Sequence, residues 1–206
     1  IHGGLCHSQN IESIFGHTPG FKIALPSTAA DAKGLLTTAI RMEDPVLFLE
    51  HKALYRAASA RTPTPPEDYT LPFGEARIAR EGSDMTIVTY GMMVQKSLNA
   101  AKELEKEGVD VEVVDLRTIV PLDSDTILES VKKTNRALVV YEDHEFIGFG
   151  AELCAQIGDD AFKYLDAPIR RVAGEFSPIP FAHSLERAVL PSDEGILDAA
   201  RNLAAF

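Results

Sequence analysis

Four apolar segments alternate with amphipathic helical patterns between residues 75 and 206. The segments cover residues 86–90, 111–116, 137–141 and 169–172. The first three are apolar through most of their length, which is typical of strands buried on both faces of a parallel sheet, and residues 169–172 begin and end with an apolar residue. The helical pattern is clearest where Val94, Leu98, Ala101 and Leu104 share one face. This alternation predicts an α/β fold with a mostly parallel sheet between two layers of helices.

A proline-rich segment separates this region from the first part of the chain. Residues 61–72 hold four prolines, which remove backbone hydrogen-bond donors and favour an extended linker. Before the linker we expect strands at residues 21–25 and 45–49, with a helix between them that begins at Ser27 or Thr28 and ends near Arg41. After it, further helices are expected behind Asp123, over residues 150–165 and from Ser192. The chain therefore divides into two α/β units.

Ligands of parallel sheets generally lie beyond the carboxyl ends of the strands. Residues 91–93, 117–118, 142–145 and 174–175 would form that edge. Gly148 and Gly150 form a GxG pattern, but such a short pattern favours a tight turn from strand to helix over a phosphate site. The edge therefore predicts a site without defining its chemistry.

Charge and cysteine content narrow the class of protein. The net charge is -11, and residues 75–206 carry 14 basic and 24 acidic groups. Such a surface disfavours nucleic acid and anionic membranes and suits a basic protein partner, although a need for solubility explains it equally well. No apolar run approaches the roughly 20 residues of a membrane-spanning helix. Cys6 and Cys154 match no metal or disulfide pattern, so we expect a reduced, cytoplasmic protein.

Among the six histidines, His7 is the candidate functional residue. It follows Gly3 and Gly4, which predict a flexible loop that could approach a ligand, and an imidazole exchanges protons near neutral pH. An ordinary surface role remains the alternative from composition alone.

The other histidines offer weaker signals. His144 stands among acidic residues that could bind a cation, but a solvated acidic loop is the preferred interpretation. His51 and His183 lack suitable neighbours in sequence, and His17 is typical of a turn. We predict no metal site.

Short motifs along the whole chain resemble the β chain of thiamine-diphosphate-dependent 2-oxo acid dehydrogenases of the pyruvate and branched-chain types. Before the linker these motifs are His7-Ser8-Gln9 and residues 15–23, 26–27, 31–36, 44–46 and 50–56. After it they are residues 80–84, 86–88, 90–94, 114–118, 121–123, 148–152 and 167–172. Their common order makes the resemblance specific.

The resemblance implies a domain organisation. Residues 1–56 would be the C-terminal part of a pyrimidine-binding domain, residues 57–74 a linker, and residues 75–206 a transketolase C-terminal-type domain. It also implies that the catalytic glutamate precedes Ile1, in agreement with the missing initiator methionine, and that this chain alone is inactive. His7 matches the active-site histidine of the family's HSQ motif.

The resemblance also implies cofactors and partners. Thiamine diphosphate and Mg²⁺ would be held mainly by an α portion, whether separate or fused, and K⁺ by main-chain carbonyls at residues 39–44. The expected partners are that α portion, a second β chain and the peripheral subunit-binding domain of the E2 acyltransferase. Two alternatives stay open: a non-catalytic docking module, and an enzyme of the transketolase or deoxyxylulose-phosphate synthase type. The identity of the 2-oxo acid is not predicted.

Overall fold

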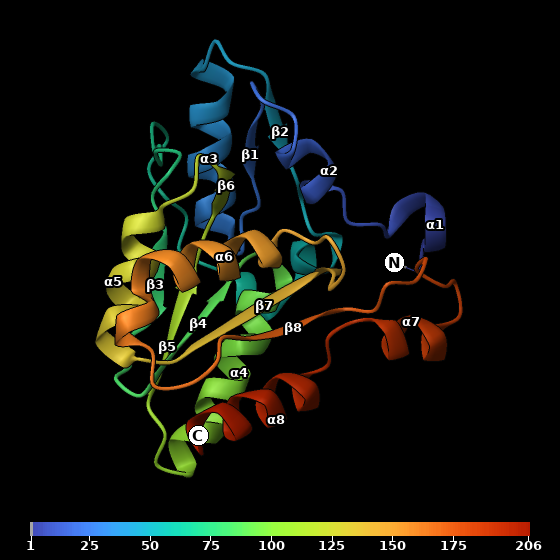
Figure 1. Ribbon diagram of the computed structural model, residues 1–206. Coiled ribbons are helices and arrows are strands. Elements are labelled where there is room, and N and C mark those ends of the chain that lie inside the picture. Colours follow the sequence, from blue (N-terminus) through green and yellow to red (C-terminus); the bar gives the residue numbers. More distant parts are fainter. Residues whose placement is uncertain (1) are drawn as a thin grey trace.

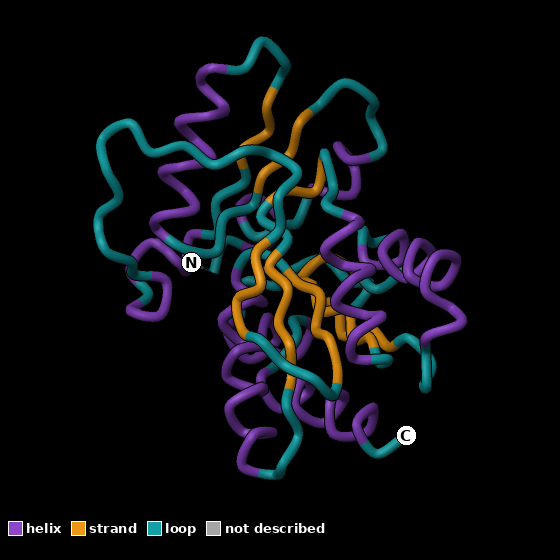
Figure 2. Tube along the Cα trace, turned by 90° about the vertical axis from the view of Figure 1, so that its left-hand side faces the viewer, coloured by secondary structure: helices purple, strands orange, loops and turns teal. Residues whose placement is uncertain are grey.

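The computed structural model describes residues 2–206, which build two sheets (Figure 1). The strands are β1 (Lys22–Ala24), β2 (Val46–Phe48), β3 (Arg77–Arg80), β4 (Met85–Thr89), β5 (Val111–Asp115), β6 (Thr118–Val120), β7 (Ala137–His144) and β8 (Arg170–Gly174). One sheet has the order β2-β1-β6 and the other the order β3-β5-β4-β7-β8. Figure 2 shows the two groups of strands one above the other, with helices on both sides.

The helices flank these sheets. The α-helices are α1 (Gly4–His7), α2 (Glu12–Gly16), α3 (Ala29–Arg41), α4 (Met92–Lys106), α5 (Ser124–Thr134), α6 (Gly150–Ala161), α7 (His183–Val189) and α8 (Asp193–Ala204). Short 3₁₀ helices are η1 (Lys52–Arg56), η2 (Ala58–Ala60) and η3 (Phe162–Tyr164). Three predicted caps are present, because Thr28, Asp123 and Ser192 each accept a backbone N–H from the first turn of their helix.

The five-stranded sheet separates two apolar cores. Val88, Val114 and Val139 face α5 and α6, whereas Ile87, Val113 and Leu138 face α4 and α8. The pairs β4–β5, β4–β7 and β7–β8 are parallel, which confirms the predicted α/β fold with a mostly parallel sheet. Among the described strands of this sheet, only β3 was not expected. It pairs antiparallel with β5 at the edge of the sheet.

Strand β6 links the two units. It follows β5 in sequence but pairs antiparallel with β1, where Ile23 lies opposite Val120 and Ala24 opposite Thr118. Residues from beyond the linker therefore complete the sheet of the first unit. A division of the chain at residues 57–74 does not anticipate this exchange.

The proline-rich segment is extended, and it is fixed against α3. The main chain of Leu71 is bonded twice, with its N–H donating to Gly34 O at 3.1 Å and its carbonyl accepting from Thr38 Oγ1 at 2.6 Å. Lys33 Nζ donates to the carbonyls of Pro65 and Pro66 at 3.0 and 2.5 Å. The linker is therefore packed against α3 of the first unit.

Candidate functional site

The carboxyl ends of β1, β2, β4 and β7 meet at the junction of the two units. A cavity of about 320 Å³ opens there. Its lining residues are His2, His7, Ser8, Gln9, Asn10, Glu50, His51, Lys52, Ala53, Glu142, Glu186 and Leu190. A smaller cavity of about 70 Å³ shares Asn10, Glu50, His51 and Glu142 with it and adds Glu12, Tyr90 and Gly91. Of the segments expected to form the ligand edge, those that carry Gly91 and Glu142 line these cavities, and Glu142 lies within β7 rather than in a loop.

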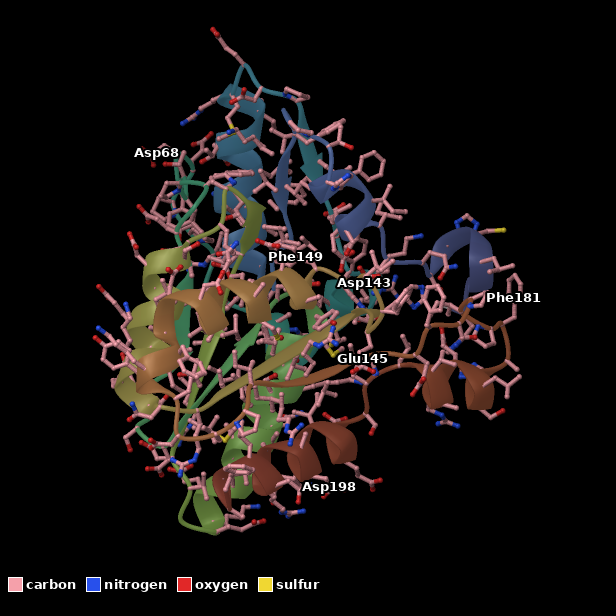
Figure 3. All side chains as sticks on the ribbon, in the orientation of Figure 1. Asp68, Asp143, Glu145, Phe149, Phe181 and Asp198 are labelled. Carbon is pink, nitrogen blue, oxygen red and sulfur yellow. The ribbon has the colours of Figure 1, made fainter. Side chains whose placement is uncertain are left out.

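His7 is the last residue of α1, and its exposed side chain borders the larger cavity. Gly3 and Gly4, which precede His7 in the chain, lie where a side chain would clash with close neighbours. A Cβ on Gly3 would lie 2.4 Å from His7 Cβ, and one on Gly4, whose φ is +53°, would lie 2.6 Å from the ring of Phe181. The expected flexible loop is therefore wrong, because these residues form a short helix seated on the segment that leads into α7 (Figure 3).

His51 faces the same cavity and has a partner that the sequence did not reveal. Its Nε2 lies 2.8 Å from Glu142 Oε2, although the two residues are 91 positions apart. The ring therefore spans the junction between η1 and β7. His51 and His183 lack suitable neighbours in sequence, but both have partners in space, since the ring centroids of His183 and His2 are 3.2 Å apart.

A buried acidic cluster lies beside the smaller cavity. Glu12 is 2% exposed and accepts a hydrogen bond from Tyr90 Oη at 3.0 Å. Burial, followed by repulsion from Asp143, raises the pKa of Glu12 to about 7. Next to it, Ser13 Oγ donates to Asp143 Oδ2. Glu12 thus exchanges a proton near neutral pH, close to the segment that carries His7.

Asp143 corrects the expectation of a solvated acidic loop. Strand β7 continues to His144. Asp143, near the end of this strand, faces α2 and is only 6% exposed (Figure 3). Its Oδ1 accepts the backbone N–H of His144 at 2.8 Å. The acidic run is therefore partly internal and helps to join the two units.

Comparison with known proteins places this geometry in a family. The model of the transketolase pyrimidine-binding domain matches residues 2–58, and that of the transketolase C-terminal domain matches residues 74–196. The chain belongs to the transketolase domain family.

Curated relatives of this transketolase-family chain include two proteins of Bacillus subtilis. The chain is 48% identical to its pyruvate dehydrogenase E1 component subunit beta over 206 residues, which are 100% of the chain and 62% of the relative. It is 46% identical to its 2-oxoisovalerate dehydrogenase subunit beta over 207 residues, 100% of the chain and 63% of the relative. The resemblance to β chains of 2-oxo acid dehydrogenases is confirmed, and the chain spans less than two thirds of these relatives.

A solved structure supports the fold. A split-gene transketolase, described as an inactive β4 tetramer, superposes with a TM-score of 0.76 at 24% identity, covering 96% of this chain and 62% of that chain. At this identity the likeness shows the fold alone. It confirms the transketolase-like fold of the two units.

The remaining candidate, His144, packs against the segment that follows β8 in this transketolase-family chain. Its Nδ1 lies 2.7 Å from the carbonyl oxygen of Glu175, and its ring meets the Phe176 ring edge-on at 5.5 Å. Within residues 2–206, no group of three or more His, Cys, Asp or Glu side chains is arranged to hold a metal ion. Over the same residues, no helix is both long and apolar enough to cross a bilayer.

Proposed function

We propose that this chain forms the β part of the E1 component of a 2-oxo acid dehydrogenase, with His7 as a catalytic residue. One observation carries the proposal. His7 of the HSQ motif and His51 border one cavity at the carboxyl ends of the strands, in a chain 46–48% identical to β subunits of such enzymes. The complete assembled enzyme, rather than this chain alone, would be the active species.

The chemistry of an imidazole suits this position. A 2-oxo acid carries a carboxylate and a ketone oxygen, and His7 can donate a hydrogen bond to either through a ring N–H. In its neutral form it can accept a proton, and in its cationic form it can return one. Lys52, on the same cavity wall, adds a positive charge that favours an anionic substrate.

Thiamine diphosphate would supply the nucleophile and electron sink for decarboxylation when bound. The described residues fit the substrate side of such a site, because imidazoles, amides and a lysine border the cavity. They include no cluster of acidic ligands for Mg²⁺. We therefore assign the diphosphate and Mg²⁺ to an α portion. K⁺ binding by carbonyls of residues 39–44 also stays a proposal.

The acidic second unit suggests the partners. Residues 75–206 carry 24 acidic and 14 basic groups, which suits the basic peripheral subunit-binding domain of an E2 component. An α portion and a second β chain would complete the assembly, in the cytoplasm. Titrating the assembled enzyme with the E2 domain at rising salt tests the docking. Affinity should fall steeply with salt, and an affinity that does not change would contradict the electrostatic account.

Reconstitution tests the reaction class. The complete β chain that contains residues 1–206 is assembled with its α partner, thiamine diphosphate and Mg²⁺. We expect CO₂ release from pyruvate or a branched-chain 2-oxo acid, and no ketol transfer between sugar phosphates. Ketol transfer would establish the transketolase alternative. An assembly that binds E2 but consumes neither substrate would identify a docking module.

A further inference from the structure

The residues just after His7 are held by the second unit through two adjacent contacts. Glu12 accepts from Tyr90 Oη, and Tyr90 follows β4 directly. The next residue, Ser13, donates to Asp143 on β7. Two contacts from consecutive residues to neighbouring parallel strands fix both the position and the rotation of the start of α2.

The Tyr90–Glu12 contact is shielded from water, and the Ser13–Asp143 contact is partly buried. Glu12, Tyr90 and Asp143 are 2%, 3% and 6% exposed. The Tyr90 ring also meets the Phe149 ring edge-on at 6.2 Å, so its hydroxyl is held on a packed side chain. The second oxygen of Glu12 accepts the backbone N–H of Ile11 at 3.1 Å. A buried hydrogen bond of this kind restrains the positions of its two residues more strongly than an exposed one, because water cannot replace either partner.

The other end of the same segment is anchored separately. The N–H of Gly3 donates to Ser8 Oγ at 3.1 Å, and His2 pairs with Glu186 on α7. Four residues, 8–11, therefore connect His7 to Glu12 between two fixed points. A span this short transmits a displacement of α2 to the imidazole.

We propose that Glu12 and Tyr90 are positioning residues that set the imidazole of His7 in its cavity by tying α2 to the carboxyl end of β4. The inference rests on the proposed function, since it assigns the contact a purpose in the reaction of His7. Neither side chain needs to touch the substrate. The contact acts through the segment that carries His7.

The charges around Glu12 make the contact sensitive to pH. Asp143 and Glu142 face it from β7, Tyr90 faces it from the end of β4, and Glu50 and His51 share the small cavity with it. When Glu12 loses its proton, it gains repulsion from Asp143 and Glu142 and becomes a stronger acceptor for Tyr90. Loss of the Glu12 proton therefore changes both the hydrogen bond that ties α2 to Tyr90 and the electrostatic repulsion between α2 and β7.

A double-mutant cycle in the assembled holoenzyme tests the proposal. We expect Tyr90→Phe and Glu12→Ala each to lower kcat about tenfold while KM changes less than twofold. In a His7→Ala background the same changes should lower kcat less than twofold further, because a positioning residue has no function once its target is absent. Glu12→Gln keeps an acceptor for Tyr90 and should recover most of the kcat lost in Glu12→Ala.

The matched control is Tyr164→Phe, which removes a hydroxyl from a partly exposed ring on η3, outside both cavities. It should leave kcat unchanged. In the pH profile of kcat, the wild type should show a contribution from Glu12 near pH 7 that is lost in Glu12→Gln, whereas any inflection from His7 should remain. A normal kcat in Tyr90→Phe and Glu12→Ala, or losses that multiply fully in the His7→Ala background, would overturn the positioning role. Normal turnover in His7→Ala alone would instead overturn the proposed function.

Discussion

Arg117 Nη2 lies 2.9 Å from Asp31 Oδ1, and this ion pair joins the two units of the chain. Asp31 is on α3 of the first unit, and Arg117 follows β5 in the second. Arg77 on β3 adds a second cation, 3.6 Å from Asp31 and 2.9 Å from Asp115. Both carboxylates are buried, with Asp31 2% and Asp115 0% exposed. The network therefore fixes the relative placement of the sheets whose strand ends border the cavities.

Removing Asp31 should destabilise the protein strongly. Asp31→Ala leaves Arg117 and Arg77 without one of their carboxylate partners in a buried setting, and we expect a loss of about 3–5 kcal/mol in the free energy of unfolding. Denaturant unfolding measures it. Asp198→Ala is the matched control, because Asp198 pairs with Arg201 at 3.2 Å on the exposed face of α8 and should have no measurable effect. Equal effects of the two changes would contradict the account.

Two glycines of α6 should respond oppositely to alanine. A Cβ on Gly150 would lie 1.9 Å from the ring of Tyr141, which is fully buried, so Gly150→Ala should destabilise by about 1–3 kcal/mol. A Cβ on Gly158 would meet only Ile169 Cδ1, at 3.9 Å. Gly158→Ala should therefore stabilise by about 0.5–1 kcal/mol through helix propensity. Thermal unfolding of both variants measures the difference, and shifts of the same sign would show that packing at Tyr141 is not the constraint.

The raised pKa of Glu12 predicts a specific pH dependence of stability. The pKa rises from 4.5 to about 7 in the folded protein, so between these values the native state binds more protons than the unfolded state. Stability from this group is therefore present at low pH and lost as pH rises through about 7. Glu12→Gln removes the effect. As the pH rises from 4.5 to 8, the free energy of unfolding of Glu12→Gln should therefore increase relative to that of the wild type by up to about 3 kcal/mol.

The quantity to follow is how the difference in free energy of unfolding between Glu12→Gln and wild type changes with pH. The difference at a single pH is not enough, because Gln also alters the hydrogen bond to the N–H of Ile11. Glu75→Gln, on an exposed residue, is the control and should track the wild type at all pH values. A constant difference between Glu12→Gln and wild type would show that Glu12 titrates normally.

The parts of the fold that the sequence predicted are those with strong local patterns. Strands β4, β5 and β7 are buried over most of their length on both faces, so most of their residues are apolar. Strands β3 and β6 were missed for a physical reason. Each has three or four residues. Strand β3 carries an arginine at both ends, and β6 is defined by its pairing with β1, whose residues lie 94 and 97 positions away in sequence.

The candidate site was predicted in part. The HSQ motif and the rule for strand ends indicated His7 and the segments that carry Gly91 and Glu142. Glu12 lay outside the matched motifs, and nothing in the motifs around Tyr90 and His51 singled these two residues out. Their importance comes from burial and from partners 78 to 91 positions away, which only the tertiary structure brings together. The GxG at Gly148 was interpreted correctly as a tight turn from strand to helix. It lies between β7 and α6, and a Cβ on Gly148 would lie 2.0 Å from the carbonyl oxygen of His144.

The most direct test of the account is the turnover of the assembled enzyme with His7→Ala. The imidazole borders the cavity, and Gly3 packs against the Cβ and main chain of His7, which alanine retains, so the change should leave assembly intact. We expect kcat for the 2-oxo acid to fall at least about 100-fold, as for a general acid–base group. His17→Ala, outside both cavities, should keep wild-type kcat. A His7→Ala enzyme with the same turnover as His17→Ala would contradict the central claim.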